Sequence, residues 1–276
     1  MRQWLRPLAL IAILLVVLYP LAWMVGTALK SPEEIVSNIG LIPEKFTPEN
    51  FRAGWDKFDV SFGRFFLNSA VVAGLTVVGN VVSCLLAAYA LGRLRFRLRG
   101  LWFAVMIGTL LLPGHVLIIP QYILFRTLGW VGGDWPYLPL IVPQFLATEA
   151  FFVFLMVQFM RGIPRELDEA ATIDGASAFQ VFKQIILPLS RPALVTTAIF
   201  SFIWTWNDFF RQLVFLSDLK DYTVPVALTL FIDSTSESAV GPMFAMSLLS
   251  LIPVFLFFVA FQRMLVEGIN TSGLKG

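Results

Sequence analysis

Six apolar runs constrain this chain more than any other feature of its sequence. Each is about 20 residues long, the length of helix that crosses roughly 30 Å of hydrocarbon. The runs cover approximately residues 7–28, 66–91, 101–125, 137–160, 193–216 and 242–264. Hydrophobic residues make up 58% of the chain and charged residues 14%, which is more apolar surface than one water-soluble core needs. Because helices satisfy their own backbone groups in lipid, we predict an all-α integral membrane protein with six transmembrane helices.

The first apolar run follows Arg2 and Arg6, as the apolar core of a secretory signal peptide would. It continues to Ala28, however, and is longer than the usual core of a signal. No small-x-small cleavage site follows it before Lys30. We therefore expect residues 7–28 to remain as a membrane span.

Charged residues at the ends of the runs predict the orientation. Four arginines crowd the connection between the second and third runs: Arg93, Arg95, Arg97 and Arg99. An excess of arginine in a short connection marks the cytoplasmic side. Both termini are then cytoplasmic, with Arg263 and Lys275 near the second, and so is the segment 161–192. The segment 217–241 is then external, and it is acidic, with Asp218, Asp221, Asp233 and Glu237 against Lys220.

Composition excludes several kinds of site. A formal net charge of +2 is too small to indicate a nucleic-acid partner. Cys84 is the only cysteine, so the chain cannot form an intrachain disulfide or a cysteine-based metal cluster. His115 is the only histidine, which excludes a histidine-based metal cluster. We therefore predict no metal site, and packing as the role of Cys84.

We interpret residues 1–276 as one transmembrane domain without internal repeats or a separate soluble part. Its longest external connection, 29–65, is broken by three prolines and should pack as a small cap. The apolar residues expected to anchor that cap are Phe46, Phe51, Trp55 and Phe58. The remaining segments are the loop 161–192 and a cytoplasmic tail, 265–276.

The loop 161–192 carries the signals of two short helices. The first should begin at Pro164, because proline suits a first helical position and acidic residues follow it: Glu166, Asp168 and Glu169. Asp174-Gly175 is a turn pair. Alanines on both sides of this turn would let a partner's backbone approach closely: Ala170, Ala171, Ala176 and Ala178.

The second helix of the loop should start at Ser177, which has the capping-box spacing to Gln180. Pro188 and Pro192 should end or kink it. Its apolar residues recur every three or four positions: Phe179, Phe182, Ile185 and Ile186. Such a stripe suits either a docking surface or an amphipathic helix that lies on lipid.

The same loop contains Glu169-Ala170-Ala171, then Gly175, then Ile186-Leu187-Pro188. These residues and their spacing resemble the conserved cytoplasmic "EAA" loop of ABC importer permeases. An amphipathic helix lying on lipid would not require that combination. The resemblance therefore favours a docking surface for an ATP-hydrolysing subunit.

The resemblance covers almost the whole chain and is strongest to the maltose-type second permease of the carbohydrate-importer branch. The similar segments are Phe46-Thr47-Pro48-Glu49-Asn50-Phe51, Asn68-Ser69, Pro113 with Pro120, Trp206-Asn207-Asp208 and the tail Gly268 to Gly276. In this family the permease is a transport subunit, and ATP hydrolysis takes place on a separate chain. The absence of a G-x-x-x-x-G-K-[ST] motif from this sequence agrees with that division.

The resemblance also implies partners in a bacterial cytoplasmic membrane. They are a second, homologous permease subunit, two copies of a cytoplasmic ABC ATPase that binds ATP and Mg, and an extracytoplasmic solute-binding protein. Glu169 would make the charged contact with the ATPase, Gly175 the sharp turn, and Ile186-Leu187-Pro188 the anchor back to the helix bundle. Ala170, Ala171 and Asp174 complete the expected coupling loop. No cofactor is expected in the chain itself, and no catalytic residue.

Polar residues within the spans are candidates for the translocation pathway, because ionisable groups in a membrane usually face a bundle interior or a water-filled path. We expect Glu149 near the middle of the fourth span, with His115, Asn80 or Gln144 as its partner. It could line the pathway or form a buried structural hydrogen bond. His115, after the helix-weakening pair Pro113-Gly114, is open to the same two interpretations.

Asp208 and Arg211 lie three residues apart, which places them on one helix face and allows an ion pair. Trp204 and Trp206 could stack on a sugar ring or belong to the aromatic belt at the membrane surface. Asn207 completes the candidate pathway.

Three other functions were weighed. Within the transport class, the solute could be a phosphorylated polyol or a modified or amino sugar, for which Arg211 is the only supporting cation. From a different class, the chain could be an integral-membrane enzyme acting on lipid-linked substrates through Glu149, Asp208 or His115. An ion channel is less supported, because no acidic ring or carbonyl-filter motif occurs in the sequence.

Overall fold

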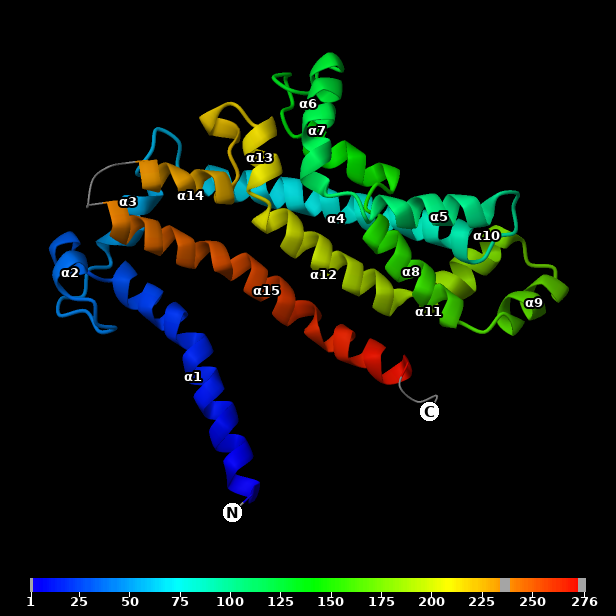
Figure 1. The fold of residues 1–276 in the computed structure, drawn as a ribbon, viewed down its shortest axis with the longest axis horizontal. Coiled ribbons are helices and arrows are strands. Elements are labelled where there is room, and N and C mark those ends of the chain that lie inside the picture. Colours follow the sequence, from blue (N-terminus) through cyan, green and yellow to red (C-terminus); the bar gives the residue numbers. More distant parts are fainter. Residues whose placement is uncertain (1, 234–238, 273–276) are drawn as a thin grey trace. The chain divides into compact units, whose positions relative to one another are not determined.

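The computed structural model describes residues 2–233 and 239–272, and in these two ranges it contains helices and no strand (Figure 1). The elements are α1 (Arg2–Ala28), α2 (Pro32–Ser37), α3 (Glu49–Trp55), α4 (Phe62–Gly92), α5 (Arg99–Thr109), η1 (Gly114–Leu117), α6 (Ile118–Thr127), α7 (Leu138–Ile141), η2 (Val142–Leu146), α8 (Ala150–Gly162), α9 (Glu166–Ile173), α10 (Ala178–Val181), η3 (Phe182–Ile186), α11 (Leu187–Leu189), α12 (Arg191–Asn207), α13 (Phe210–Phe215), η4 (Leu219–Asp221), α14 (Val224–Asp233) and α15 (Val240–Ser272). Glu237, Lys275 and the tail from Gly273 to Gly276, which the sequence analysis named, lie outside the described residues.

Four stretches are long and apolar enough to cross a membrane as they stand: Pro7–Ala28, Phe62–Gly92, Leu138–Gly162 and Val240–Met264. Two more pass the same test only as bent pairs, Arg99–Thr109 with Gly114–Thr127 and Ala178–Leu189 with Arg191–Asn207. Within residues 2–233 and 239–272 there are thus four candidate spans, or up to six if each bent pair counts as one.

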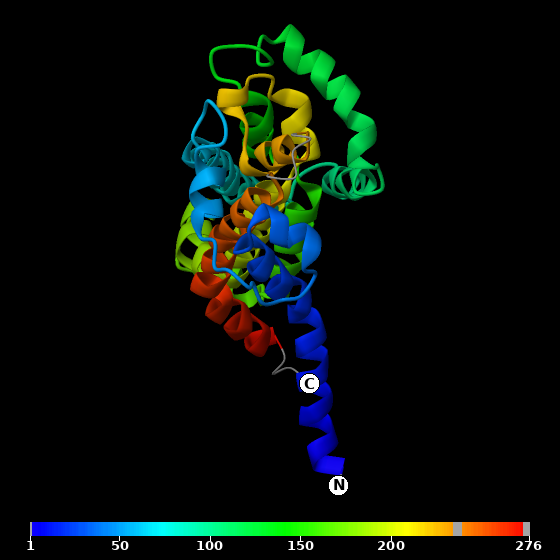
Figure 2. The same cartoon turned by 90° about the vertical axis from the view of Figure 1, so that its left-hand side faces the viewer.

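The third predicted span is broken. A bend of 95° separates Arg99–Thr109 from Gly114–Thr127, and Figures 1 and 2 show α6 turning away from α5. Pro113 stands at the break with an extended backbone (φ −63°, ψ 121°), and a proline there also restricts the residue before it. A single helix over 101–125 was therefore a wrong prediction, although Pro113-Gly114 marked the weak point.

The fourth and fifth runs are interrupted as well. In the fourth, η2 ends at Leu146 and is followed by Ala147, whose left-handed backbone (φ 54°) precludes a continuous helix; α8 begins only at Ala150. In the fifth, α12 ends at Asn207 and a separate short helix, α13, follows. Each interruption places one acidic residue, Glu149 or Asp208, at a helix end.

The chain divides into two compact units, Met1–Asn68 with Tyr222–Pro253, and Ser69–Asp221 with Val254–Gly276. In the first unit, the segment predicted as a cap forms α2 and α3 around the buried Lys30. The Lys30 ammonium donates hydrogen bonds to the carbonyl oxygens of Asn38 (2.6 Å) and Gly40 (2.5 Å). The backbone N–H of Glu44 donates to the Glu34 carboxylate (2.6 Å), which lowers the pKa of that carboxyl.

The predicted apolar anchors of the 29–65 segment divide into two groups. Trp55 stacks on Phe66 at 6.0 Å between ring centroids, and Phe58 packs edge-on against Phe231 at 4.9 Å. Phe46 is 66% exposed, so its assignment as an anchor was wrong.

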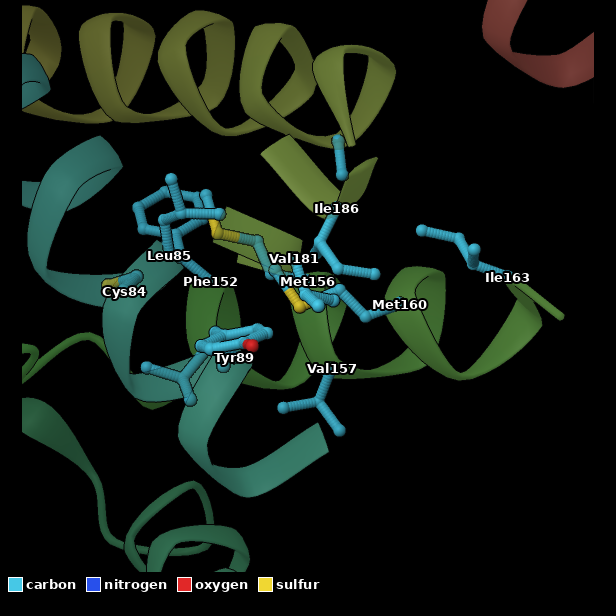
Figure 3. Close-up of a cluster of buried hydrophobic side chains, with 13 residues drawn as sticks. Cys84, Leu85, Tyr89, Phe152, Met156, Val157, Met160, Ile163, Val181 and Ile186 are labelled. Atoms are coloured by element: carbon cyan, nitrogen blue, oxygen red, sulfur yellow. The ribbon is translucent and has the colours of Figure 1, made fainter. Parts of the chain in front are cut away.

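The second unit has a core where α4 and α8 meet the 161–192 hairpin (Figure 3). Tyr89 of α4 and Met156 of α8 lie beside Val181 and Ile186 of the hairpin, and all four side chains are buried. Most of the apolar side of the second hairpin helix is therefore packed in protein, whereas Phe179 at its start is 69% exposed. An amphipathic helix merely lying on lipid is ruled out by this packing. Cys84 belongs to the same core, in agreement with its predicted packing role.

Candidate functional site

A cavity of about 410 Å³ in the second unit collects most of the predicted pathway residues; we call it the polar cavity. Its size is within the usual range of small-ligand sites. The lining comes from α4, η2, the start of α8 with the residue before it, α12, α13 and the segment between these last two: Thr76, Asn80, Gln144, Glu149, Phe152, Ser201, Ile203, Trp204, Thr205, Asn207, Asp208 and Arg211. Amides, hydroxyls and charges thus meet one exposed indole among otherwise apolar helices.

Arg211 stands between the two acidic residues of the polar cavity. Its Nη1 lies 3.6 Å from Oε1 of Glu149, and its Nε lies 3.9 Å from Oδ2 of Asp208. All three side chains are between a quarter and a third exposed. The predicted Asp208–Arg211 pair is confirmed. The predicted partners of Glu149 were wrong, because its ion pair is with Arg211.

The helix interruptions explain these contacts. Glu149 precedes the first residue of α8 and makes no side-chain cap, so its carboxylate is available to Arg211; its predicted place in the middle of a helix was wrong. Asp208 follows the last residue of α12, and its Oδ1 accepts a hydrogen bond from the backbone N–H of Arg211 (3.1 Å). This local hydrogen bond starts a new turn, as aspartate side chains often do. Asp208 and Arg211 therefore pair across a break, not along one continuous helix.

The two tryptophans have different environments. Trp204 is 45% exposed, lines the polar cavity and stacks on Phe152, with ring centroids 5.1 Å apart. Trp206 is 4% exposed and stacks on Phe202. Trp204 therefore offers an indole face to a solute, and Trp206 does not. Asn207 donates its side-chain amide to the carbonyl oxygen of Ile203 (2.8 Å).

Asn80 and Gln144, suggested by the sequence as possible partners of Glu149, both line the polar cavity. Asn80 donates its amide to Oγ of Ser201 (2.9 Å), which joins α4 to α12. Oδ1 of Asn80 and Oε1 of Gln144 are buried and have no hydrogen-bond partner in the described part of the chain. Thr76 and Ser201 were not singled out, because one hydroxyl in an apolar run has no distinctive pattern.

His115 lines a neighbouring cavity of about 380 Å³, which shares Glu149, Asp208 and Arg211 with the polar cavity. Its ring lies 5.1 Å from that of Phe210. The pathway residues predicted from the sequence thus gather around one ionic cluster, with Trp206 turned into the protein core. Over residues 2–233 and 239–272, no three His, Cys, Asp or Glu side chains lie close enough together to hold a metal ion.

The hairpin has the predicted local structure. Gly175 adopts a left-handed backbone (φ +85°) between α9 and α10, a conformation that glycine reaches without strain. Both hydrogen bonds of the Ser177–Gln180 capping box are present. The first helix begins at Glu166, two residues after the predicted start at Pro164.

One arginine joins this hairpin to α4 and α8. Arg93 is buried, and its Nη2 donates to the carbonyl oxygens of Met160 (2.6 Å) and Ile163 (2.7 Å) at the end of α8. Its Nη1 lies 3.2 Å from Oδ2 of Asp168 in α9. Burial lowers the pKa of Arg93, and the Asp168 carboxylate partly offsets that effect.

Tyr89, one turn earlier in α4, donates its hydroxyl to the carbonyl oxygen of Ala178 (2.8 Å). Together with Arg93, it connects α4 to both helices of the hairpin. We call these contacts the Arg93 clamp. From the sequence, Arg93 was predicted only to mark the orientation, because its partners lie far away along the chain.

Most of the expected docking residues are exposed, and the expected anchor is buried only at Ile186. Glu169, Ala170, Asp174 and Gly175 are exposed, whereas Ala171 packs partly against the core. Ile186 is fully buried at the end of a π-helical turn, followed by the half-buried Leu187 and the exposed Pro188. A 69° bend then leads into α12.

Comparison with known proteins identifies the family. Residues 79–271 match the model of the "Binding-protein-dependent transport system inner membrane component" family. The chain is 33% identical to the probable ABC transporter permease protein YurM of Bacillus subtilis, covering 95% of this chain and 85% of that one. It is 32% identical to the trehalose/maltose transport system permease protein MalG of Thermococcus litoralis, covering 95% and 93%.

A solved structure shares the fold. A bacterial ABC transporter involved in the import of the acidic polysaccharide alginate superposes with a TM-score of 0.82 at 22% identity, covering 94% of each chain. The family consists of transport subunits, so the interpretation as a membrane enzyme was wrong. This chain belongs to the binding-protein-dependent ABC transporter permeases, as an inner-membrane transport subunit and not an enzyme.

Proposed function

We propose that this chain forms half of the translocation pathway of an ATP-driven importer for a sugar or sugar-like solute. The polar cavity carries the proposal, because it sets an exposed indole face beside amides, hydroxyls and carboxylates within apolar helices. Aromatic faces with a few placed polar groups suit ring-shaped, hydroxylated ligands. Relatives named for trehalose or maltose and for galactooligosaccharides support the solute class.

The proposed assembly has this chain beside a second, homologous permease subunit, with two cytoplasmic ABC ATPases that bind ATP and Mg. An extracytoplasmic binding protein delivers the solute. An alginate transporter solved in complex with its oligosaccharide-bound periplasmic protein supports that arrangement. We place the chain in a bacterial cytoplasmic membrane as six spans with both termini inside, the two bent pairs each counting as one span.

The hairpin is the proposed contact with the ATPase. Its exposed surface carries Glu169, Ala170, Asp174 and Gly175, and its buried side is held by the core and by the Arg93 clamp. A push on the exposed surface would therefore move α4 and α8, which supply part of the polar cavity wall. Ile186-Leu187-Pro188 anchors the hairpin before the bend into α12.

The test is a charge reversal, Glu169→Arg, in cells that express the whole importer. We expect loss of ATPase co-purification with the membrane subunits, or ATP hydrolysis without uptake of the solute that the binding protein captures. Glu166→Arg is the matched control, because Glu166 is also exposed in α9 but lies outside the proposed contact. Normal assembly and uptake in the Glu169 variant would falsify the proposed contact.

A further inference from the structure

The polar cavity contains one more acid than base. Its lining includes the carboxylates of Glu149 and Asp208 but only one cation, Arg211. In the described residues around it, the ionic cluster therefore carries a net negative charge. The helix interruptions place both carboxylates close to the guanidinium. The excess negative charge therefore follows from the course of the backbone.

Arg211 is already engaged on two sides. Glu149 lies against its Nη1 and Asp208 lies near its Nε. An anionic solute that approached Arg211 would compete with both carboxylates and would leave them less well compensated in a site of low dielectric. Repulsion between the solute anion and these two carboxylates would therefore disfavour the binding of anionic solutes.

The wall of the polar cavity also contains buried polar atoms without a hydrogen-bond partner in the described residues: two amide oxygens, the Thr76 hydroxyl and Nε of Arg211. The side-chain amide of Asn80 donates its N–H to Oγ of Ser201. Oδ1 of Asn80 and Oε1 of Gln144 are buried acceptors to which no group in the described structure donates. Buried acceptors without donors are costly. A hydroxyl can donate to the two amide oxygens and also accept from Thr76 or Arg211, whereas an ionised phosphate or carboxylate can only accept and leaves the amide oxygens without a donor.

We propose that the polar cavity selects hydroxylated solutes without negative charge, with Glu149 and Asp208 as the specificity-determining residues. This inference rests on the proposed function of the polar cavity as a solute pathway. Trp204 supplies the face on which a pyranose ring stacks. Arg211 compensates one of the two carboxylate charges and is not available to bind an anion. Phosphorylated polyols are therefore excluded as the solute class. The related fold that imports acidic alginate shows that the fold itself permits an anionic solute, so the discrimination lies in the charges of this cavity.

The test uses the complete permease–ATPase complex, purified in detergent without its binding protein. Four probes share one pyranose ring and differ in charge: glucose, glucosamine, glucuronate and glucose 6-phosphate. Their binding is titrated by the change in tryptophan fluorescence, and Trp204→Phe identifies the signal from the cavity. We expect glucuronate and glucose 6-phosphate to bind about tenfold or more weakly than glucose, and glucosamine to bind at least as well as glucose.

Neutral variants then locate the discrimination. Glu149→Gln and Asp208→Asn should each bring the glucose-to-anion affinity ratio towards one, and the double variant should favour the anions, because Arg211 is then uncompensated. Asp218→Asn is the matched control, because that carboxylate is exposed beside Lys220 and does not line the polar cavity. It should leave the ratio unchanged.

Three results would overturn the proposal: anions that bind as tightly as glucose, a ratio that neither substitution changes, or no binding of any probe. The proposed function fails differently. If the complex does not assemble, or cells lacking this chain still import the solute that the binding protein captures, the transport role itself is wrong. If assembly and uptake are intact and only the ratio is wrong, the charge inference alone fails.

Discussion

Two arginines in the second unit each meet acidic side chains, yet their surroundings differ. Arg93 has a side chain 3% exposed, with hydrogen bonds of 2.6 and 2.7 Å to two carbonyl oxygens and 3.2 Å to Asp168. Arg211 is 31% exposed and lies 3.6 and 3.9 Å from its carboxylates. Short, buried, charge-assisted bonds hold a geometry, whereas longer contacts at a cavity wall leave groups free to meet a solute.

The largest expected effect is at the Arg93 clamp. Arg93→Met should lower the free energy of unfolding by about 3–5 kcal/mol, because it leaves a partly buried carboxylate and two carbonyl oxygens without their donor. The measurements are thermal unfolding and co-purification of the ATPase. Arg95→Met is the control, since Arg95 is exposed beside the same hairpin. Equal melting temperatures for the two variants would mean that the Arg93 clamp contributes as little to stability as the Arg211 contacts are expected to.

A somewhat smaller effect should follow from emptying the hairpin anchor. Ile186→Ala should cost about 2–4 kcal/mol, because Ile186 is fully buried between α4 and α8. Ile173→Ala on the exposed side of the hairpin should change the melting temperature little, since that side chain is 86% exposed. Matching losses in both variants would mean that the hairpin does not have one buried and one exposed side.

The turn of the hairpin gives an intermediate test of rigidity. Gly175→Ala should cost about 1–2 kcal/mol, because alanine is strained at a φ of +85° even though the space around Gly175 is open. Gly100→Ala is the control in α5, where the backbone is helical and the space is also open. Proteolysis of the hairpin, followed over time, should be faster only in the Gly175 variant. If cleavage rates are equal, the turn does not depend on the left-handed backbone.

The smallest effect on stability is expected at the polar cavity. Arg211→Gln should change the free energy of unfolding by about 1 kcal/mol or less, because its ion pairs are long and partly exposed. It should nevertheless reduce solute uptake, since Glu149 and Asp208 then repel each other across the cavity. Calorimetry with a parallel uptake assay measures both. A large loss of stability would show that this cluster is structural, like the Arg93 clamp.

Much of the local structure could be predicted because its causes lie within a few residues. The capping box at Ser177 and Gln180, the glycine turn at Gly175 and the pairing of Asp208 with Arg211 all follow from short spacings, and the structure contains each. The apolar runs predicted the four candidate spans that do not depend on a bent pair, for the same reason. Pro113-Gly114 indicated a weak point in the third run but not a bend of 95°.

The errors concern contacts between distant residues. Glu149 pairs with Arg211, which is 62 residues further along the chain, and no periodicity in the fourth run indicates that partner. Arg93 reaches the end of α8 and Asp168 of α9, so its role could not be separated from that of the other three arginines beside it. Trp204 and Trp206 are two residues apart, and only packing decides which of them faces the cavity.

The sequence by itself determined that the chain is a helical membrane protein of the permease family with a capped two-helix hairpin, because hydrophobic length, capping and turn chemistry act locally. The tertiary structure alone decided where the helices break, that Glu149 and Asp208 share one arginine, and that Arg93 holds the hairpin against α4 and α8. Those outcomes depend on which distant backbone segments pack together. Burial then decides how much each ion pair contributes to stability. Arg93 lies in the core, where its contacts are short, and Arg211 lies at the wall of the cavity, where they are long and partly exposed.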